Sequence, residues 1–203
     1  MDKKWIDWLE NDLNRGCNKD DIITTLKNNN FKETVINKEI KLYYLNKNKY
    51  LILNHYHVFS NKLNNNFLIK KYKHDKIELF LTNNFLSENS IKNIKKPSSV
   101  DTINDKINRL VTVPIYETTS YDLVHNKKFN EFVYIDDNEI TTWVSLLIKE
   151  NTVLQFKNID KKFKLKPGSI LLFSVFDEEC NINENISFKT SKPVYYKRFF
   201  KII

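Results

Sequence analysis

The stretch that decides the fold reads Phe163-Lys-Leu-Lys-Pro-Gly-Ser-Ile-Leu-Leu-Phe173. Apolar and charged residues alternate before the Pro167-Gly168 pair, and an apolar run over 170–176, interrupted only by Ser174, follows it. Alternation with a period of two is typical of a strand with one buried face, whereas a short apolar run favours a strand that is buried on both faces. Pro followed by Gly marks a turn. The stretch therefore predicts two strands joined by a tight turn.

Short segments with strand character continue on both sides of this stretch. From residue 77 onward they lie at 77–82, 109–116, 131–135, 140–148, 152–156, 162–165, 169–176, 186–189 and 193–202, with a helix expected at 87–95. Alternation predicts two further strands at 40–45 and 50–59. Many short strands separated by turns are typical of a sandwich or barrel. The predicted fold is therefore mainly β, within the α+β class, and a jelly roll (a double-stranded β-helix) satisfies the pattern.

The first residues predict a helical prefix. Trp5, Leu9 and Leu13 recur every four residues, which gives one apolar helix face. Gly16 is placed to end this helix in the left-handed conformation, and Asn18 is placed to cap a second helix. We therefore expect two domains, a helical prefix over 1–35 that serves as a packing appendage and a jelly-roll domain over 36–203.

Composition limits the classes of function. The formal net charge is +8, but a general bias toward Lys and Asn accounts for much of it. Specific nucleic-acid contacts favour Arg, which occurs only at Arg15, Arg109 and Arg198, so nucleic acid is disfavoured as a partner. Cys17 and Cys180 stand alone and match neither a zinc motif nor a disulfide framework. Without a signal peptide or a membrane-length apolar run, we expect a cytoplasmic protein with no membrane partner.

The second half of the chain resembles a known family. Tyr116 to Phe129 reads Tyr-Glu-Thr-Thr-Ser-Tyr-Asp-Leu-Val-His-Asn-Lys-Lys-Phe. This resembles the Tyr-Glu-x-Gly-x-Tyr-Phe-x-x-His-x-Asp segment of 2-oxoglutarate/Fe(II)-dependent dioxygenases of the prolyl 4-hydroxylase type. Residues 139–148, 163–173 and 187–194 resemble three later elements of the same family, in the same order. The resemblance covers roughly residues 76–203 and implies a double-stranded β-helix.

The resemblance also implies a metal site with most of its ligands replaced. The family holds iron with two His and one Asp; here His125 matches the first His, Lys127 stands at the Asp and Lys189 at the second His. Lysine offers only donors and would place positive charge beside a metal ion. Lys197 or Arg198 stands where the family grips the far carboxylate of 2-oxoglutarate. Neighbours on a strand face opposite sides, so at most one points inward, and an inward cation needs an anionic partner.

The leading interpretation is a dioxygenase-like pseudoenzyme with a decayed metal site, which binds a protein or peptide partner or a small anion. One alternative is an active oxygenase with unusual ligation that uses Fe(II) and 2-oxoglutarate to hydroxylate a peptide or prolyl side chain. Another is a basic nucleic-acid-binding protein. Other candidate metal ligands are the His55 and His57 pair on one strand face, the His74-Asp75 pair, and Asp122 if a bulge turns it toward His125.

Overall fold

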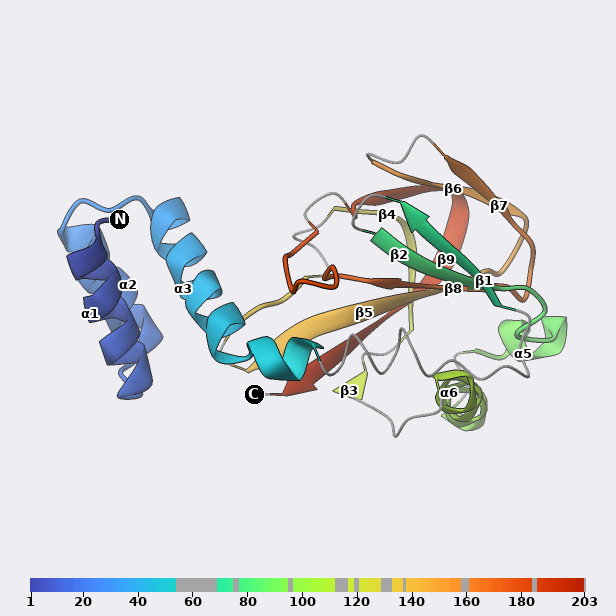
Figure 1. The fold of residues 1–203 in the computed structure, drawn as a ribbon. Helices are drawn as coiled ribbons and strands as arrows, with labels where there is room; N and C mark the ends of the chain where they lie inside the picture. The colour runs from blue at the N-terminus through green and yellow to red at the C-terminus, as the bar shows by residue number, and fades with distance from the viewer. Residues whose placement is uncertain are drawn as a thin grey trace. The chain divides into compact units, whose positions relative to one another are not determined.

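A computed structural model describes residues 1–53, 69–74, 77–94, 97–111, 117–118, 121–128, 133–136, 138–157, 161–183 and 186–202 (Figure 1). The chain divides into two compact units, Met1–Lys49 with Ile135–Asn138, and Tyr50–Tyr134 with Glu139–Ile203. Each unit contains its own cluster of buried apolar side chains. None of the described helices combines the length and the apolar character that a membrane crossing requires.

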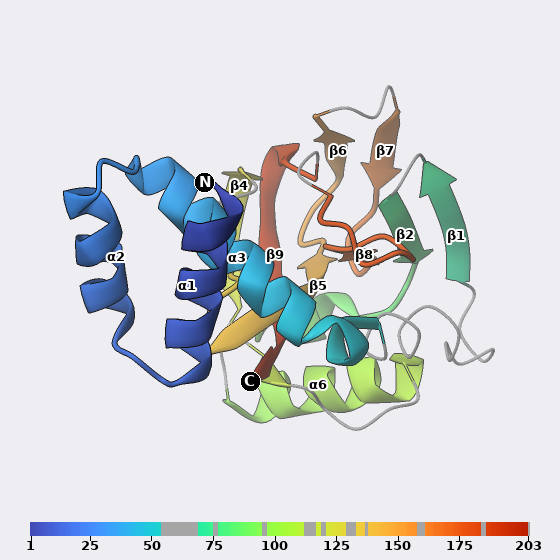
Figure 2. The same cartoon turned by 60° about the vertical axis from the view of Figure 1, so that its left-hand side comes forward.

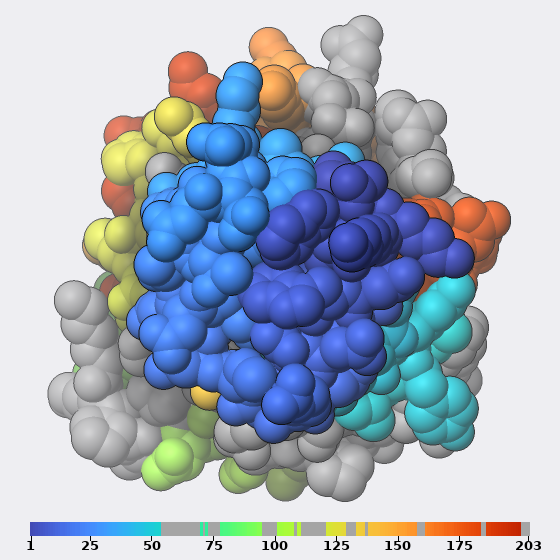
Figure 3. Space-filling view, turned by 90° about the vertical axis from the view of Figure 1, so that its left-hand side faces the viewer, coloured from blue at the N-terminus to red at the C-terminus, as the bar shows by residue number. Residues whose placement is uncertain are grey.

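Three helices build the first unit: α1 (Lys3–Asn14), α2 (Lys19–Asn28) and α3 (Glu33–Lys47). Figure 2 shows them side by side, and Figure 3 shows the outer surface that their side chains form. Asn18 caps α2 by accepting hydrogen bonds from the backbone of Asp20 and Asp21, as predicted. Gly16 ends α1 with a φ of 74°, also as predicted. The core of the unit is formed by Leu9, Leu13, Ile22, Leu26, Ile36, Ile40, Tyr43 and Tyr44.

The third helix corrects one prediction. Residues 40–45 were expected to form a strand but belong to α3, and residues 49–53 are helical where the next strand was expected. Alternate apolar positions suggested the strand, yet Ile36, Ile40 and Tyr43 are spaced at four and three residues and are all buried. Packing of that helical stripe against α1 and α2 therefore decides the structure. His55 and His57 lie outside the described residues.

The second unit is built on one antiparallel sheet. Its described strands are β1 (Ile69–His74), β2 (Ile77–Thr82), β3 (Glu117–Thr118), β4 (Asp122–Lys127), β5 (Glu139–Leu147), β6 (Thr152–Phe156), β7 (Lys162–Leu165), β8 (Ile170–Ser174) and β9 (Phe188–Ile202). Their order is β1-β2-β8-β5-β9-β6-β7, with β3 and β4 also paired to β9. Strands far apart in sequence lie next to one another and the sheet curls (Figure 1), as in a jelly-roll-like fold. The predicted fold class is confirmed.

The turn at Pro167-Gly168 is confirmed as well. The backbone nitrogen of Ser169 donates to the carbonyl of Lys166 at 3.1 Å, and Gly168 has a φ of 80°. Pro at the second position and Gly with positive φ at the third are typical of a type II turn. The turn leads from β7 into β8, whose five residues are all buried. Strand β8 pairs with β2 on one side and β5 on the other, and the burial of successive side chains on both of its faces explains its continuous apolar sequence.

Two helices, α5 (Glu88–Lys92) and α6 (Pro97–Val111), share a buried apolar cluster with the sheet (Figure 1). The helix expected at 87–95 is confirmed in shorter form. The strand expected at 109–116 is wrong over 109–111, because α6 continues through Val111; 112–116 lie outside the described residues. Residues 133–134, inside another expected strand, form none. Ile103, Ile107 and Leu110 are four and three residues apart, so they lie on one face of α6. That face is buried in the cluster that the helix shares with the sheet.

Candidate functional site

The functional candidates on β9 face opposite sides of the sheet, as strand alternation requires. Lys197 is 2% exposed and lies between Tyr195 and Phe199, which belong to the apolar cluster shared with α6. Its Nζ donates a hydrogen bond to Oδ1 of Asn104 on α6 at 2.6 Å. The same Nζ lies 4.5 Å from the ring centroid of Tyr121. The inward-facing candidate is therefore Lys197.

Burial changes the protonation of this lysine. Loss of water around the ammonium lowers the pKa of Lys197 to about 8. Both of its described partners, the Asn104 amide oxygen and the Tyr121 ring, are neutral. A buried ammonium without an anionic partner is an unfavourable arrangement, which an anion beside it would relieve.

Two hydroxyl groups lie buried near this lysine. Ser145 of β5 is the register partner of Lys197 on β9, so the two side chains stand next to each other on the same face of the sheet. Its Oγ and the hydroxyl of Tyr121 are both buried and have no hydrogen-bond partner among the residues that the structure describes. Burial raises the pKa of Tyr121, so its hydroxyl stays a donor at neutral pH. We call Lys197, Asn104, Tyr121 and Ser145 the Lys197 cluster.

Three members of this cluster escaped the sequence analysis. Tyr121, Asn104 and Ser145 come from separate segments, and their proximity depends on the register of β5 with β9 and on the packing of α6. A signal for Ser145 was available, because it is a polar residue in the buried centre of the apolar strand Glu139–Leu147. No comparable signal marked Asn104, which sits in a helix that was not predicted.

Arg198 occupies the other face and already has an anionic partner. Its Nη1 donates to Oε1 of Glu139 at 2.5 Å and to Oγ1 of Thr141 at 2.8 Å, and its guanidinium lies 4.2 Å from the ring centroid of Tyr134. These contacts hold the side chain along β5 and away from the Lys197 cluster. Of the two basic candidates, Arg198 is thus the less suited to take up a further carboxylate.

The positions matched to metal ligands do not form a metal site. His125 lies at a register irregularity of β4 with an exposed side chain, and Lys189 is also exposed. The ammonium of Lys127 lies over the ring of Tyr196, 5.3 Å from its centroid. Asp122 is exposed, and no group of three His, Cys, Asp or Glu residues within the described segments could hold a metal ion. Two ammonium groups repel a cation, so these residues do not fit iron.

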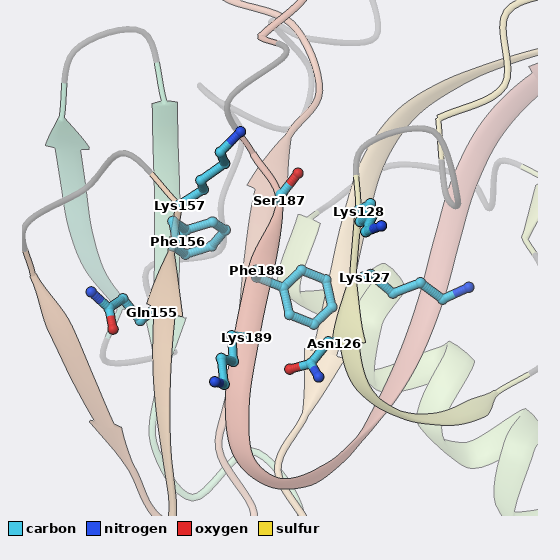
Figure 4. A pocket seen from close by; sticks show the side chains of 9 residues that line it. All are labelled: Asn126, Lys127, Lys128, Gln155, Phe156, Lys157, Ser187, Phe188 and Lys189. Carbon is cyan, nitrogen blue, oxygen red and sulfur yellow. The ribbon is translucent and has the colours of Figure 1, made fainter.

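A basic hollow occupies this region instead. It has a volume of about 290 Å³ and lies where β4 and β6 end and β9 begins (Figure 4). Register pairs Phe188 of β9 with Lys127 of β4 and with Phe156 of β6, so the three strands run side by side here. Among the described residues that line the hollow, none is acidic. They are Asn126, Lys127, Lys128, Gln155, Phe156, Lys157, Ser187, Phe188 and Lys189.

Comparisons with known proteins give structural matches only. No protein-family model matches the sequence, and no curated protein matches it either. Two solved structures of a viral collagen prolyl hydroxylase from Paramecium Bursaria Chlorella virus-1 are similar. The 2OG complex has a TM-score of 0.46 at 9% identity over 62% of this chain and 96% of that chain. A truncated form has a TM-score of 0.40 at 10% identity over 62% and 90%.

The first prediction from this geometry concerns iron, which the protein should not bind. We expect anaerobic titration with Fe(II) to give no saturable binding, because Lys127 and Lys189 offer no lone pair in their charged form and repel the ion. Metal analysis after desalting should find no retained iron in either the natural chain or the His125→Ala variant. A prolyl 4-hydroxylase with an intact ligand triad serves as the positive control. Stoichiometric iron that disappears in His125→Ala would show that a metal site exists.

Proposed function

We propose that this chain is a non-catalytic, dioxygenase-like binding protein whose Lys197 cluster binds a small carboxylate. The observation that carries the proposal is the buried ammonium of Lys197, whose described partners are both neutral. The resemblance is compatible with this residue, because Lys197 or Arg198 stands where the family grips the far carboxylate of 2-oxoglutarate, and of the two Lys197 is the buried one. The lysines at two of the three positions matched to metal ligands, Lys127 and Lys189, support binding without oxygen chemistry.

The donor groups of the cluster suit a carboxylate. The ammonium of Lys197 offers three N–H donors, and the hydroxyls of Tyr121 and Ser145 can each donate one hydrogen bond. A carboxylate has about four acceptor positions and no donor, so it can accept from all three side chains. Hydrogen bonds between charged partners are about twice as strong as neutral ones. A carboxylate bound here would replace the Asn104 oxygen as acceptor and would neutralise the buried charge.

Calorimetric titration of the metal-free protein tests the proposal. With a chelator present, 2-oxoglutarate and succinate are the probes, since both are small dicarboxylates. The natural chain should bind at least one of them, and the Lys197→Met variant should bind neither. Lys192→Met is the matched control, because Lys192 is an exposed lysine of the same strand, and it should bind as the natural chain does. Equal binding by all three proteins would refute the assignment.

Carboxylate binding should depend on pH in a defined window. Affinity requires the protonated ammonium, and burial places the pKa of Lys197 in the free protein at about 8. The association constant for the carboxylate should therefore be constant below this pH. Above it the constant should fall by up to about tenfold per pH unit, because the deprotonated lysine must take up one proton when the carboxylate binds. Titrations at pH 6.5, 7.5, 8.5 and 9.5 measure the slope. A constant affinity across this range would mean that Lys197 is not the binding group.

A further inference from the structure

Strands β4, β9, β6 and β7 carry a row of polar side chains on one exposed face. Register pairs Lys189 of β9 with Asn126 of β4 on one side and with Gln155 of β6 on the other. Gln155 is in turn the register partner of Lys162 of β7. Register partners project to the same side of a sheet, so the four side chains form one row across four strands. All four are exposed, and Figure 4 shows Gln155 and Lys189 on neighbouring strands.

Two more lysines extend this row into a basic surface. Lys164 lies two residues after Lys162 on β7. Lys157 lies two residues after Gln155, and it still pairs with β9 because its backbone nitrogen donates to the Ser187 carbonyl at 2.8 Å. Side chains two residues apart on a strand share a face and are separated by roughly 7 Å. We call this surface the lysine face; its four lysines, all exposed, are Lys157, Lys162, Lys164 and Lys189.

The lysine face is the solvent side of the sheet. Burial alternates along β7 and β6, where Phe163 and Phe156 point the other way and are buried. Phe188, which precedes Lys189 on β9, is buried on that inner side too. The rings fix the strands from within, while the lysines project from them into solvent. A partner can therefore reach the lysine face without uncovering any buried side chain.

The described residues around the lysine face supply no opposite charge. Strands β6 and β7 and residues 186–192 contain no Asp or Glu. None of the four lysines makes an ion pair or a hydrogen bond through its side chain with another described residue. Lysines on neighbouring positions and strands are roughly 7 to 10 Å apart, which is within the distance over which charges interact at moderate salt. Together they create a positive potential that attracts an extended anionic surface.

The composition of the lysine face selects among anionic partners. Protein interfaces are depleted of Lys and are anchored by aromatic side chains, and the outward positions of β6 and β7 hold no aromatic ring. Single-stranded nucleic acid stacks its bases on aromatic rings, which are missing here for the same reason. Arginine, which forms the forked contacts of specific phosphate and base recognition, is absent from the face. A bilayer with anionic headgroups requires only lysines near its surface.

We propose that the lysine face adsorbs this protein reversibly to a bilayer surface that carries anionic headgroups. Lysine stems are long and flexible, so their ammonium groups can reach headgroups while the sheet stays rigid. Each lysine near such a surface strengthens binding by about fivefold. The expectation of no membrane partner rests on the lack of an apolar run long enough to cross a bilayer, and adsorption through charge needs no such run.

Adsorption does not depend on the carboxylate site. Lys197 is 2% exposed and belongs to the buried side of β9 that packs against α6, whereas the lysine face contains only exposed lysines. The proposal can therefore fail without affecting the proposed function. Vesicle binding should be unchanged in Lys197→Met.

Sedimentation with lipid vesicles tests the proposal. The vesicles contain phosphatidylcholine with about 30% phosphatidylserine, and vesicles of phosphatidylcholine alone are the neutral reference. The natural chain should sediment with the anionic vesicles, stay in solution with the neutral ones, and dissociate when salt is raised to about 0.5 M. The Lys162→Gln/Lys189→Gln variant should bind the anionic vesicles roughly tenfold to thirtyfold more weakly, because it lacks two of the four lysines.

The matched control is Lys38→Gln/Lys92→Gln, which removes the same charge from exposed lysines of α3 and α5 and should bind like the natural chain. Urea unfolding should give the same midpoint for both double variants, since all four positions are exposed. Equal weakening by the two variants would reduce the effect to overall charge and overturn the proposal, as would no binding to anionic vesicles. Tighter binding to a short DNA duplex, lost in Lys162→Gln/Lys189→Gln, would assign the face to nucleic acid and overturn it as well.

Discussion

The Lys197→Met variant should be more stable than the natural chain at pH 7, by about 2 kcal/mol in the free energy of unfolding, even as it loses carboxylate binding. A shift of the lysine pKa from 10.5 to about 8 corresponds to on the order of 3 kcal/mol of penalty for holding the charge inside the protein. Loss of the hydrogen bond to Asn104 offsets about 1 kcal/mol of the gain. Met keeps an unbranched apolar chain in the same space.

The difference between the two proteins should vary with pH in one direction. Below pH 8 the lysine is charged in both the folded and the unfolded state, so the penalty is fully present. Between about 8 and 10.5 the folded protein releases its proton while the unfolded chain keeps it, so stability of the natural chain rises with pH. The advantage of Lys197→Met should therefore shrink across this window, measured by urea unfolding at pH 7, 8.5 and 10.

Ligand and control measurements decide between this account and a simple packing effect. Saturating carboxylate should stabilise the natural chain by linkage and leave Lys197→Met unchanged. Lys192→Met, which replaces an exposed lysine, should change stability by no more than about 0.5 kcal/mol at any pH. A Lys197→Met protein that is less stable than the natural chain at pH 7 would contradict a poorly compensated buried charge.

Local sequence patterns correctly predicted those elements whose secondary structure is determined by the residues within the element itself. Strands β2, β6, β7 and β8 lie where alternation or an apolar run placed them, and the Pro167-Gly168 turn joins β7 to β8 as expected. Helix α6 was missed because its sequence, with Ser, Asn and Asp frequent over 97–111, favours helix weakly. Its buried stripe of Ile103, Ile107 and Leu110 forms only against the sheet, so tertiary packing decides its structure.

The sequence predicted one pair of residues in the candidate site but not their surroundings. The resemblance singled out Lys197 together with Arg198, and strand alternation implied that only one would face inward. Which one it was depended on which side of β9 the helix α6 covers, and no local pattern records this. The pairing of β5 with β9 brings Ser145 next to Lys197, although the two residues are fifty-two positions apart in the sequence. Tyr121, which also contacts Lys197, comes from a third segment. Long-range pairing of this kind is invisible to periodicity.

Gly168→Ala should destabilise the second unit by about 2 to 5 kcal/mol, because the added methyl group meets both a backbone clash and a positive φ. A Cβ at this position would lie 2.3 Å from the backbone carbonyl oxygen of Leu86, and that segment is tied to the turn because the Leu86 nitrogen donates to the Gly168 carbonyl. A φ of 80° adds about 1 to 2 kcal/mol of strain for any residue with a side chain. The clash adds a further 1 to 3 kcal/mol, since backbone must move to relieve it.

Gly16→Ala separates the conformational strain of a positive φ from the steric clash of the added Cβ. Gly16 has a similar φ of 74°, but a Cβ there would meet nothing within 4 Å. It closes α1 in a Schellman motif, in which the Cys17 nitrogen donates to the Asp12 carbonyl and the Gly16 nitrogen donates to that of Leu13. This variant should therefore lose only the conformational part, about 1 to 2 kcal/mol.

Amide hydrogen exchange reports the two units individually, through the amides of β8 for Gly168→Ala and those of α1 for Gly16→Ala. The β8 amides should lose several-fold more protection than the α1 amides do, because the clash exists only at the turn. Similar losses in both variants would mean that Leu86 and its neighbours move aside without cost. The close approach of the turn to residues 85–86 would then contribute little to holding β8 in the centre of the sheet.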